Sequence, residues 1–249
     1  MFTFKLVCIL SILLITFVSG FYPFLNKRFS LREQSFPIAE SLAAGVFLGA
    51  ALIHMLGDAS DRFYQLSFHY PIAFLLAGIT FLFLLWLEHL GREIVASDGE
   101  SSGAFAVLAT VMLSVHAFLM GAALGLSATF SVAIVIFLAI LAHKWAESFA
   151  LAVQINKSVF SFKKGVFLFF VFSLMTPLGI LLGTSATGFL SNYPLLQPIF
   201  SSLAAGTFLY LGTLHGLEKA TLIKQCCDLR RFNFVVLGFA IMAVVAIWT

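Results

Sequence analysis

The chain has 249 residues, of which 61% are hydrophobic and only 10% charged, and its mean hydropathy is +1.06. A soluble domain is about 45–50% apolar and about 25% charged, so this composition excludes a soluble fold and indicates a protein that crosses a membrane several times. The formal net charge of +3 says little by itself. Cys8, Cys226 and Cys227 show no spacing typical of a disulfide framework or a zinc finger.

Eight apolar stretches of about 20 residues, the length that spans a bilayer, follow one another along the chain. They predict an all-α membrane protein with eight transmembrane helices in a single domain, residues 1–249. The first stretch also fits a cleaved signal peptide, but we interpret it as a retained helix because the repeat described below requires one. The predicted spans are 3–21, 38–57, 70–90, 104–127, 131–154, 164–186, 195–217 and 231–248.

Basic residues are concentrated in alternate loops, which predicts how the helices are oriented. Eleven of the 14 Lys and Arg residues lie in or beside the segments 22–37, 91–103, 155–163 and 218–230. We therefore expect these four loops on the cytoplasmic side and both termini outside.

An internal repeat relates residues 41–54 (SLAAGVFLGAALIH) to residues 202–215 (SLAAGTFLYLGTLH), with eight of 14 positions identical. By the predicted orientation the two copies run in opposite directions. Such inverted repeats are typical of secondary transporters, whose substrate site lies at the repeat interface near the bilayer midplane. The alternative is a chance match of small and apolar residues. The repeat predicts a 3+2+3 arrangement of helices.

Two histidines and a glutamate lie near the middle of two adjacent apolar stretches. His143 and Glu147 are four residues apart and so share one helix face, and His116 and Met120 have the same spacing. Ionisable groups at the bilayer centre are costly and mark functional sites. Because imidazole and carboxylate groups suit Zn²⁺ and Fe²⁺, we expect a transition-metal site at His116, His143 and Glu147, with Met120 as a weak ligand. Structural hydrogen bonds of the histidines are the alternative.

Lys144 follows His143 and cannot bind a metal while it is protonated. Two interpretations are open. It supplies a fixed positive charge where a second cation would otherwise sit, or it forms a structural ion pair or lines a hydrated cavity.

Other polar residues near the ends of the predicted helices suggest a route for the ion. His54 and Asp58 lie one turn apart toward the outer side, and His215 lies toward the inner side. Each could relay a cation near a membrane face, and interfacial capping is the alternative. Glu88 is expected mainly at the interface.

Small residues and a proline indicate where helices approach one another. Gly121 and Gly125 form a GxxxG pattern, which permits close helix contact. Pro177 interrupts the hydrogen bonding of its helix and marks either a kink beside a site or simple packing.

Taken together, these residues resemble the ZIP (Zrt/Irt-like) family of divalent-metal transporters, over essentially the whole chain. The resemblance implies eight helices in a 3+2+3 arrangement, outside termini, and uptake of zinc or iron into the cytoplasm. It also implies a transport site between the fourth and fifth helices, with His116, His143 and Glu147 as metal ligands. The matching motifs are His116-x-x-x-Met120-Gly121 with Gly125, His143-Lys144-x-x-Glu147, Glu88-His89-Leu90, Met175-Thr176-Pro177-Leu178-Gly179 and Ala205-Gly206-Thr207-Phe208-Leu209-Tyr210.

The chain departs from the family pattern at several positions. Many members have Glu in place of Met120, and some have an acidic residue in place of Lys144, so we expect one ion per cycle and no binuclear site. Residues 91–103 contain no His, so metal sensing by that loop is not expected. The resemblance also implies that the first, fourth, fifth and sixth helices move as a bundle against the others, within a homodimer.

The sequence therefore predicts a multi-pass transporter of a plasma or bacterial inner membrane that imports a divalent metal, zinc first and iron(II) second. Its expected partners are the metal ion and the lipid bilayer, with no nucleic acid and no cofactor. The alternative is a metal-dependent intramembrane hydrolase that uses the same residues to activate water. That enzyme would need a further acid or base, and the chain has no HExxH motif.

Overall fold

Each predicted apolar stretch lies on a helix in the structure, a computed structural model that describes residues 2–25, 36–96, 101–127, 129–158, 160–186, 193–213 and 229–247. Within these residues there is no strand, and six helical stretches are long and apolar enough to cross a membrane. The helices are α1 (Phe2–Leu25), α3 (Pro37–Gly49), the π-helix η1 (Ala50–Met55), α4 (Leu56–Gln65), α5 (Ile72–Ala96), α6 (Ser101–Leu126), α7 (Phe130–Lys157), α8 (Phe162–Ser185), α10 (Leu196–Tyr210) and α11 (Leu229–Val245).

The second span is longer than predicted, because α3, η1 and α4 form one continuous helix from Pro37 to Gln65. The predicted end at residue 57 marks only where the apolar stretch stops. Beyond it the helix continues as an amphipathic segment, with Ala59 and Phe63 buried and polar residues on another face. The helix ends beside Ser67, whose φ of 68° is left-handed.

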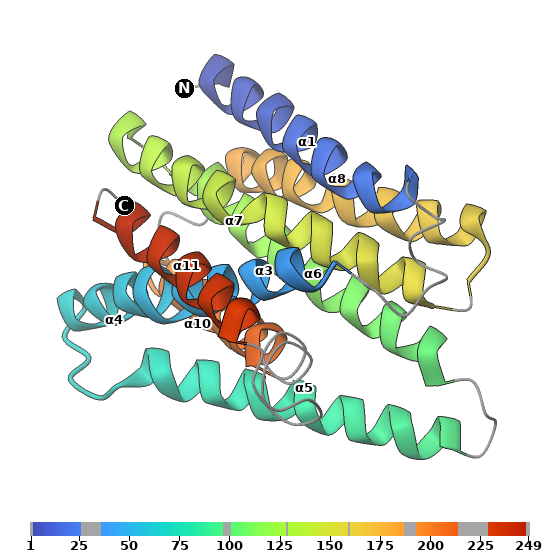
Figure 1. The fold of residues 1–249 in the computed structure, drawn as a ribbon. Coiled ribbons are helices and arrows are strands. Elements are labelled where there is room, and N and C mark those ends of the chain that lie inside the picture. Colours follow the sequence, from blue (N-terminus) through green and yellow to red (C-terminus); the bar gives the residue numbers. More distant parts are fainter. Residues whose placement is uncertain are drawn as a thin grey trace.

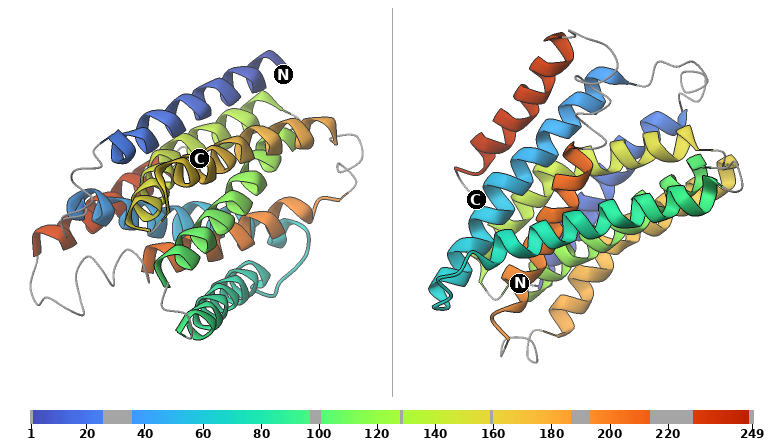
Figure 2. Two further views of the ribbon diagram at one scale, coloured as in Figure 1. Left: turned by 90° about the vertical axis from the view of Figure 1, so that its right-hand side faces the viewer. Right: turned by 90° about the horizontal axis from the view of Figure 1, so that it is seen from below.

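The helices pack side by side as four principal pairs: α6 with α8, α3 with α11, α1 with α7, and α5 with α10. Figures 1 and 2 show α1 along one edge of the molecule and α5 along the opposite edge, with the other helices between them. α6 and α7 also contact each other, which brings together the two helices that carry the predicted metal ligands.

Glycines allow the closest of these helix crossings. A side chain at Gly121 would collide with the carbonyl oxygen of Thr176, and one at Gly125 with that of Ile180. The predicted close approach at the GxxxG pattern is therefore confirmed, and its partner is α8. Thr176 directly precedes Pro177, so the proline lies at this crossing.

The two copies of the repeat share a local distortion of the helix. The first copy contains the π-helix η1, which begins at residue 50, and the second is π-helical from residue 211 to 213. Residues 50 and 211 occupy the same position in the aligned repeat. Short π-helical segments within α-helices are frequent at functional sites.

Candidate metal centre

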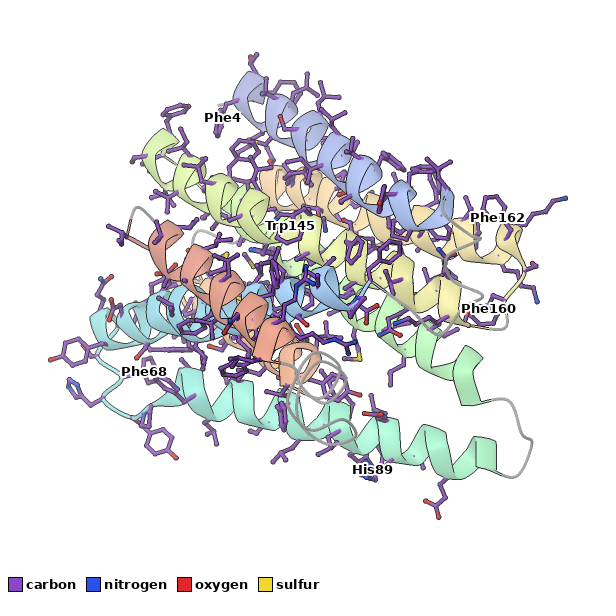
Figure 3. The ribbon with its side chains drawn as sticks, viewed as in Figure 1. Phe4, Phe68, His89, Trp145, Phe160 and Phe162 are labelled. Atoms are coloured by element: carbon purple, nitrogen blue, oxygen red, sulfur yellow. The ribbon has the colours of Figure 1, made fainter. Side chains whose placement is uncertain are left out.

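Three side chains from two helices converge at the predicted site. His116 from α6 and His143 from α7 place their Nε2 atoms 3.2 and 3.3 Å from the same atom, Oε1 of Glu147. All three side chains are at most 1% exposed. Trp145, labelled near the middle of α7 in Figure 3, lies between His143 and Glu147 in the sequence and marks the level of the cluster along the helix.

The spacing of these atoms fits a metal ion. Ligand atoms about 2.1 Å from a tetrahedral Zn²⁺ lie about 3.4 Å from one another. One ligand atom from each of the three residues lies within 4.8 Å of the other two. The three groups could therefore hold one ion with little rearrangement.

The hydrogen-bond pattern around His116 leaves Nε2 free to act as a ligand. The Thr207 hydroxyl donates to the carbonyl oxygen of Ala204 at 2.6 Å, and the same hydroxyl lies 3.1 Å from Nδ1 of His116. A hydroxyl has a single proton, so it accepts from Nδ1–H, and Nε2 then carries the lone pair.

His143 makes no hydrogen bond through either ring nitrogen, and Nε2 of His116 also lacks a hydrogen-bond partner. The short distances to Oε1 of Glu147 do not satisfy hydrogen-bond geometry. Buried polar atoms without partners are rare and call for an explanation. A cation that binds between these imidazole nitrogens and the carboxylate oxygen would give the nitrogens the partner that they lack.

Lys144 binds the other carboxylate oxygen of Glu147. Its Nζ lies 2.8 Å from Oε2 and 4.3 Å from the centroid of the Phe172 ring, and its side chain is 1% exposed. The ion pair proposed as one role of Lys144 is therefore present. Glu147 is shared, with one oxygen facing the two histidines and the other facing a fixed positive charge.

α10 supplies a third wall that the sequence reasoning missed. Phe208 stacks on His116, with ring centroids 3.9 Å apart, and meets His143 edge-on at 5.1 Å. The neighbouring Thr207 makes the hydrogen bond described above. Both residues belong to the second copy of the repeat, which was the available signal that α10 approaches the site.

A cavity of about 410 Å³ leads toward the cluster from one side. Met120, one turn after His116, lines it and is 6% exposed. His54 and Asp58 also line it, with Nδ1 and Oδ2 3.2 Å apart; their role in an outer route stays a prediction. Other polar residues in its lining are Asp61, Arg62, Gln65, Ser131, Gln197 and Ser201.

A much smaller cavity of about 40 Å³ lies on the other side of the cluster. It is lined by Leu113, one turn before His116, and by Leu151, one turn after Glu147. Glu40 is the one ionisable residue in its lining, and its Oε1 lies 2.8 Å from Nζ of Lys157. His215, predicted on the inner route, lies outside the described residues.

Glu88, which was expected mainly at the membrane interface, is buried within the protein. Its side chain is only 6% exposed and accepts a hydrogen bond from the hydroxyl of Tyr210 on α10. The fully buried tyrosine supplies the polar partner that allows a carboxylate to be buried at the α5–α10 contact.

Comparison with known proteins identifies the family. The model of a family described as ZIP zinc transporters matches residues 2–106 and 96–246. The chain belongs to the ZIP zinc transporter family. Its members are transporters and not enzymes, which decides against the intramembrane hydrolase and agrees with several membrane-spanning helices.

Relatives across animals and plants match almost the full chain. Zinc transporter ZIP2 of Mus musculus is 27% identical, with 98% of this chain and 97% of the relative aligned. Zinc transporter 11 of Arabidopsis thaliana is 26% identical, with 98% and 85% aligned. Zinc transporter ZIP1 of Takifugu rubripes is 38% identical over 53% of this chain and 43% of its own length. This ZIP protein is thus a multi-span transporter of metal ions.

Proposed function

We propose that this ZIP protein imports Zn²⁺ in the first place and Fe²⁺ in the second, and that the ion binds between α6 and α7 at His116, His143 and Glu147. The observation that carries the proposal is the convergence of two imidazole nitrogens and a carboxylate oxygen, all buried and within 4.8 Å of one another. The printed names of the relatives, which are zinc transporters, support zinc as the preferred ion.

The ion passes through the site in three steps. It enters the 410 Å³ cavity past Asp58 and His54, loses most of its water at the cluster, and leaves through the side that holds the 40 Å³ cavity. Three protein ligands leave the fourth position to water, as in sites that exchange their ligands. The basic loops predict that the smaller cavity faces the cytoplasm.

Lys144 supports transport of one ion per cycle. Its ammonium group already neutralises Oε2 of Glu147 at 2.8 Å, so a second cation beside that oxygen would meet a like charge in a site with little water. The same charge weakens the hold of Glu147 on the ion and so favours release.

The helix pairs support the 3+2+3 arrangement with inverted repeats. An inverted repeat would relate α1 to α8, α3 to α10, α5 to α11 and α6 to α7. Under this relation the α1–α7 pair corresponds to the α8–α6 pair. Likewise the α3–α11 pair corresponds to α10–α5. The outside termini, the homodimer and the placement in a plasma or bacterial inner membrane stay predictions from charge and family resemblance.

Uptake of radioactive Zn²⁺ and Fe²⁺ into sealed vesicles tests the proposal. We expect saturable uptake by the wild type, faster for Zn²⁺, and a complete loss in His143→Ala/Glu147→Ala and in Glu147→Gln. Glu93→Gln, an exposed residue of α5, is the matched control and should transport like the wild type. Full uptake by folded Glu147→Gln at low metal concentration would reject the site.

A further inference from the structure

We propose that Thr207 of α10 is a positioning residue for the metal site, and that it makes high affinity for a divalent cation depend on the contact between α6 and α10. The inference rests on the proposed function, because it assigns a role toward His116 as a ligand. Thr207 lies 91 residues from His116 in the chain, on a helix that carries none of the three proposed ligands.

The hydroxyl of Thr207 can hold His116 in only one tautomer. Its proton is committed to the carbonyl oxygen of Ala204, one turn earlier on α10, at 2.6 Å. It therefore acts as an acceptor toward Nδ1 of His116 at 3.1 Å. Because this keeps the ring proton on Nδ1, Nε2 presents its lone pair to the point where the ion would bind. Histidine ligands commonly have such a partner on the other nitrogen, which orients the ring.

The neighbouring Phe208 fixes the plane of the same ring. It stacks on His116 with a centroid separation of 3.9 Å and an interplanar angle of 20°. His116 is completely buried and Thr207 is 7% exposed, so water has little access to replace the hydroxyl. The two consecutive residues of α10 therefore determine both the proton position and the orientation of His116.

His143 has no comparable support. Neither of its ring nitrogens has a hydrogen-bond partner, and Phe208 meets its ring only edge-on. The site thus combines one histidine that is oriented in advance with one that the ion itself must orient. Without the Thr207 hydroxyl, His116 would no longer be held in one orientation, and the ion would have to orient both histidines.

This contact links two sets of helices. α6 packs mainly on α8, whereas α10 packs mainly on α5. A relative displacement of α6 and α10 would separate Thr207 from Nδ1, free His116 to change tautomer or rotate, and weaken the hold on the cation. Release of the ion is then coupled to helix movement without protonation of any ligand.

Zinc binding by the purified full chain tests this role. Competition with a chelating dye gives the Zn²⁺ dissociation constant of the wild type, Thr207→Val and Thr207→Ser. Loss of a supporting partner typically weakens metal binding by about 10–100-fold, so we expect at least about tenfold weaker binding for Thr207→Val and near-normal binding for Thr207→Ser. In vesicle uptake, Thr207→Val should raise the KM for Zn²⁺ far more than it changes kcat.

Thr213→Val is the matched control, because Thr213 on the following turns makes the same type of hydroxyl bond, to the carbonyl oxygen of Leu209 at 2.6 Å. It should bind Zn²⁺ like the wild type. If Thr207→Val does not yield folded protein, Thr207→Ala carries the same expectation.

Wild-type affinity in folded Thr207→Val, or equally weak binding by Thr207→Ser, would overturn the inference. Wild-type protein that binds no Zn²⁺, or binding that survives Glu147→Gln, would instead reject the proposed function.

Discussion

The cavities on the two sides of the His116, His143 and Glu147 cluster differ in size and in character. The cavity proposed to face outward, here called the outer cavity, has about 410 Å³ and is lined by His54, Asp58 and several other polar side chains. The cavity proposed to face the cytoplasm, here called the inner cavity, has about 40 Å³ and is lined mainly by Ala, Leu and Phe. A hydrated ion fits the first and not the second. The difference teaches that the described arrangement gives the site access from one side only, so transport requires a second arrangement.

The largest effect is expected from the Lys144–Glu147 ion pair, which lies between the two cavities. In Lys144→Met, Glu147 loses its buried partner, and breaking a buried ion pair from one side costs about 3–5 kcal/mol. We expect a clearly lower unfolding temperature without metal and a larger increase on addition of Zn²⁺ than in the wild type, because the ion becomes the sole partner of the carboxylate. Thermal unfolding with and without Zn²⁺ measures the unfolding temperature and its increase on metal binding. Lys144→Arg, which keeps the positive charge, should give values close to those of the wild type.

Cysteine labelling compares the two cavities directly. In a background with Cys8, Cys226 and Cys227 replaced by Ser, Ser201→Cys lies in the outer cavity and Ala43→Cys in the inner one. A buried thiol is inert and an accessible one reacts, so Ser201→Cys should react about tenfold faster or more with a charged methanethiosulfonate. Equal rates at both positions would contradict one-sided access.

The ion pair of Glu40 with Lys157 is expected to help to close the inner side, where it joins α3 to α7. The two side chains are 19% and 31% exposed, and pairs near the surface contribute about 0.2–1 kcal/mol. Lys157→Gln should therefore speed the labelling of Ala43→Cys by about two- to fivefold at most. Lys164→Gln, at an exposed lysine of α8, is the control. An unchanged rate would mean that apolar packing alone closes this side.

Asp58 should have the smallest effect, because its side chain is 47% exposed. Asp58→Asn removes a negative charge from the outer cavity, which lowers the local concentration of cations. We expect the KM for Zn²⁺ to rise by about two- to threefold, since exposed charges contribute at most about 1 kcal/mol, with kcat unchanged. The difference from the wild type should shrink at high salt, where exposed charges are screened.

The sequence predicted the parts of the site that depend on local spacing. His143 and Glu147 share a helix face by their separation alone, and the GxxxG at Gly121 predicted a close crossing. Its partner could not be predicted, because the carbonyl of Thr176 offers no side-chain signal. Within the described residues every predicted apolar stretch lies on a helix, because the bilayer thickness sets the hydrophobic length of a span.

The contribution of α10 could not be derived in the same way. Thr207 is a small polar residue and Phe208 an apolar one, and both lie in an apolar stretch. In a membrane helix, residues of these types are ordinarily interpreted as packing residues. Their role depends on a contact across 91 residues of chain. The burial of Glu88 was missed for the same reason, because the hydroxyl of Tyr210 that satisfies it lies on another helix.

The π-helix η1 has a consequence for how the second span can change. A π-helical turn holds one residue more than an α-helical turn, and one residue corresponds to about 100° around an α-helix. Removal of one residue from 50–55 would leave Gly45 against α11 and the span long enough for a bilayer. Because the α-helical turn that replaces the π-helical turn covers the same rotation with one residue fewer, Asp58 and Arg62 would still face the 410 Å³ cavity. The π-helix is therefore the place in this span where one residue can be lost without rotating either flank, whereas a deletion in α3 or α4 would turn one part of the helix by about 100° against the other.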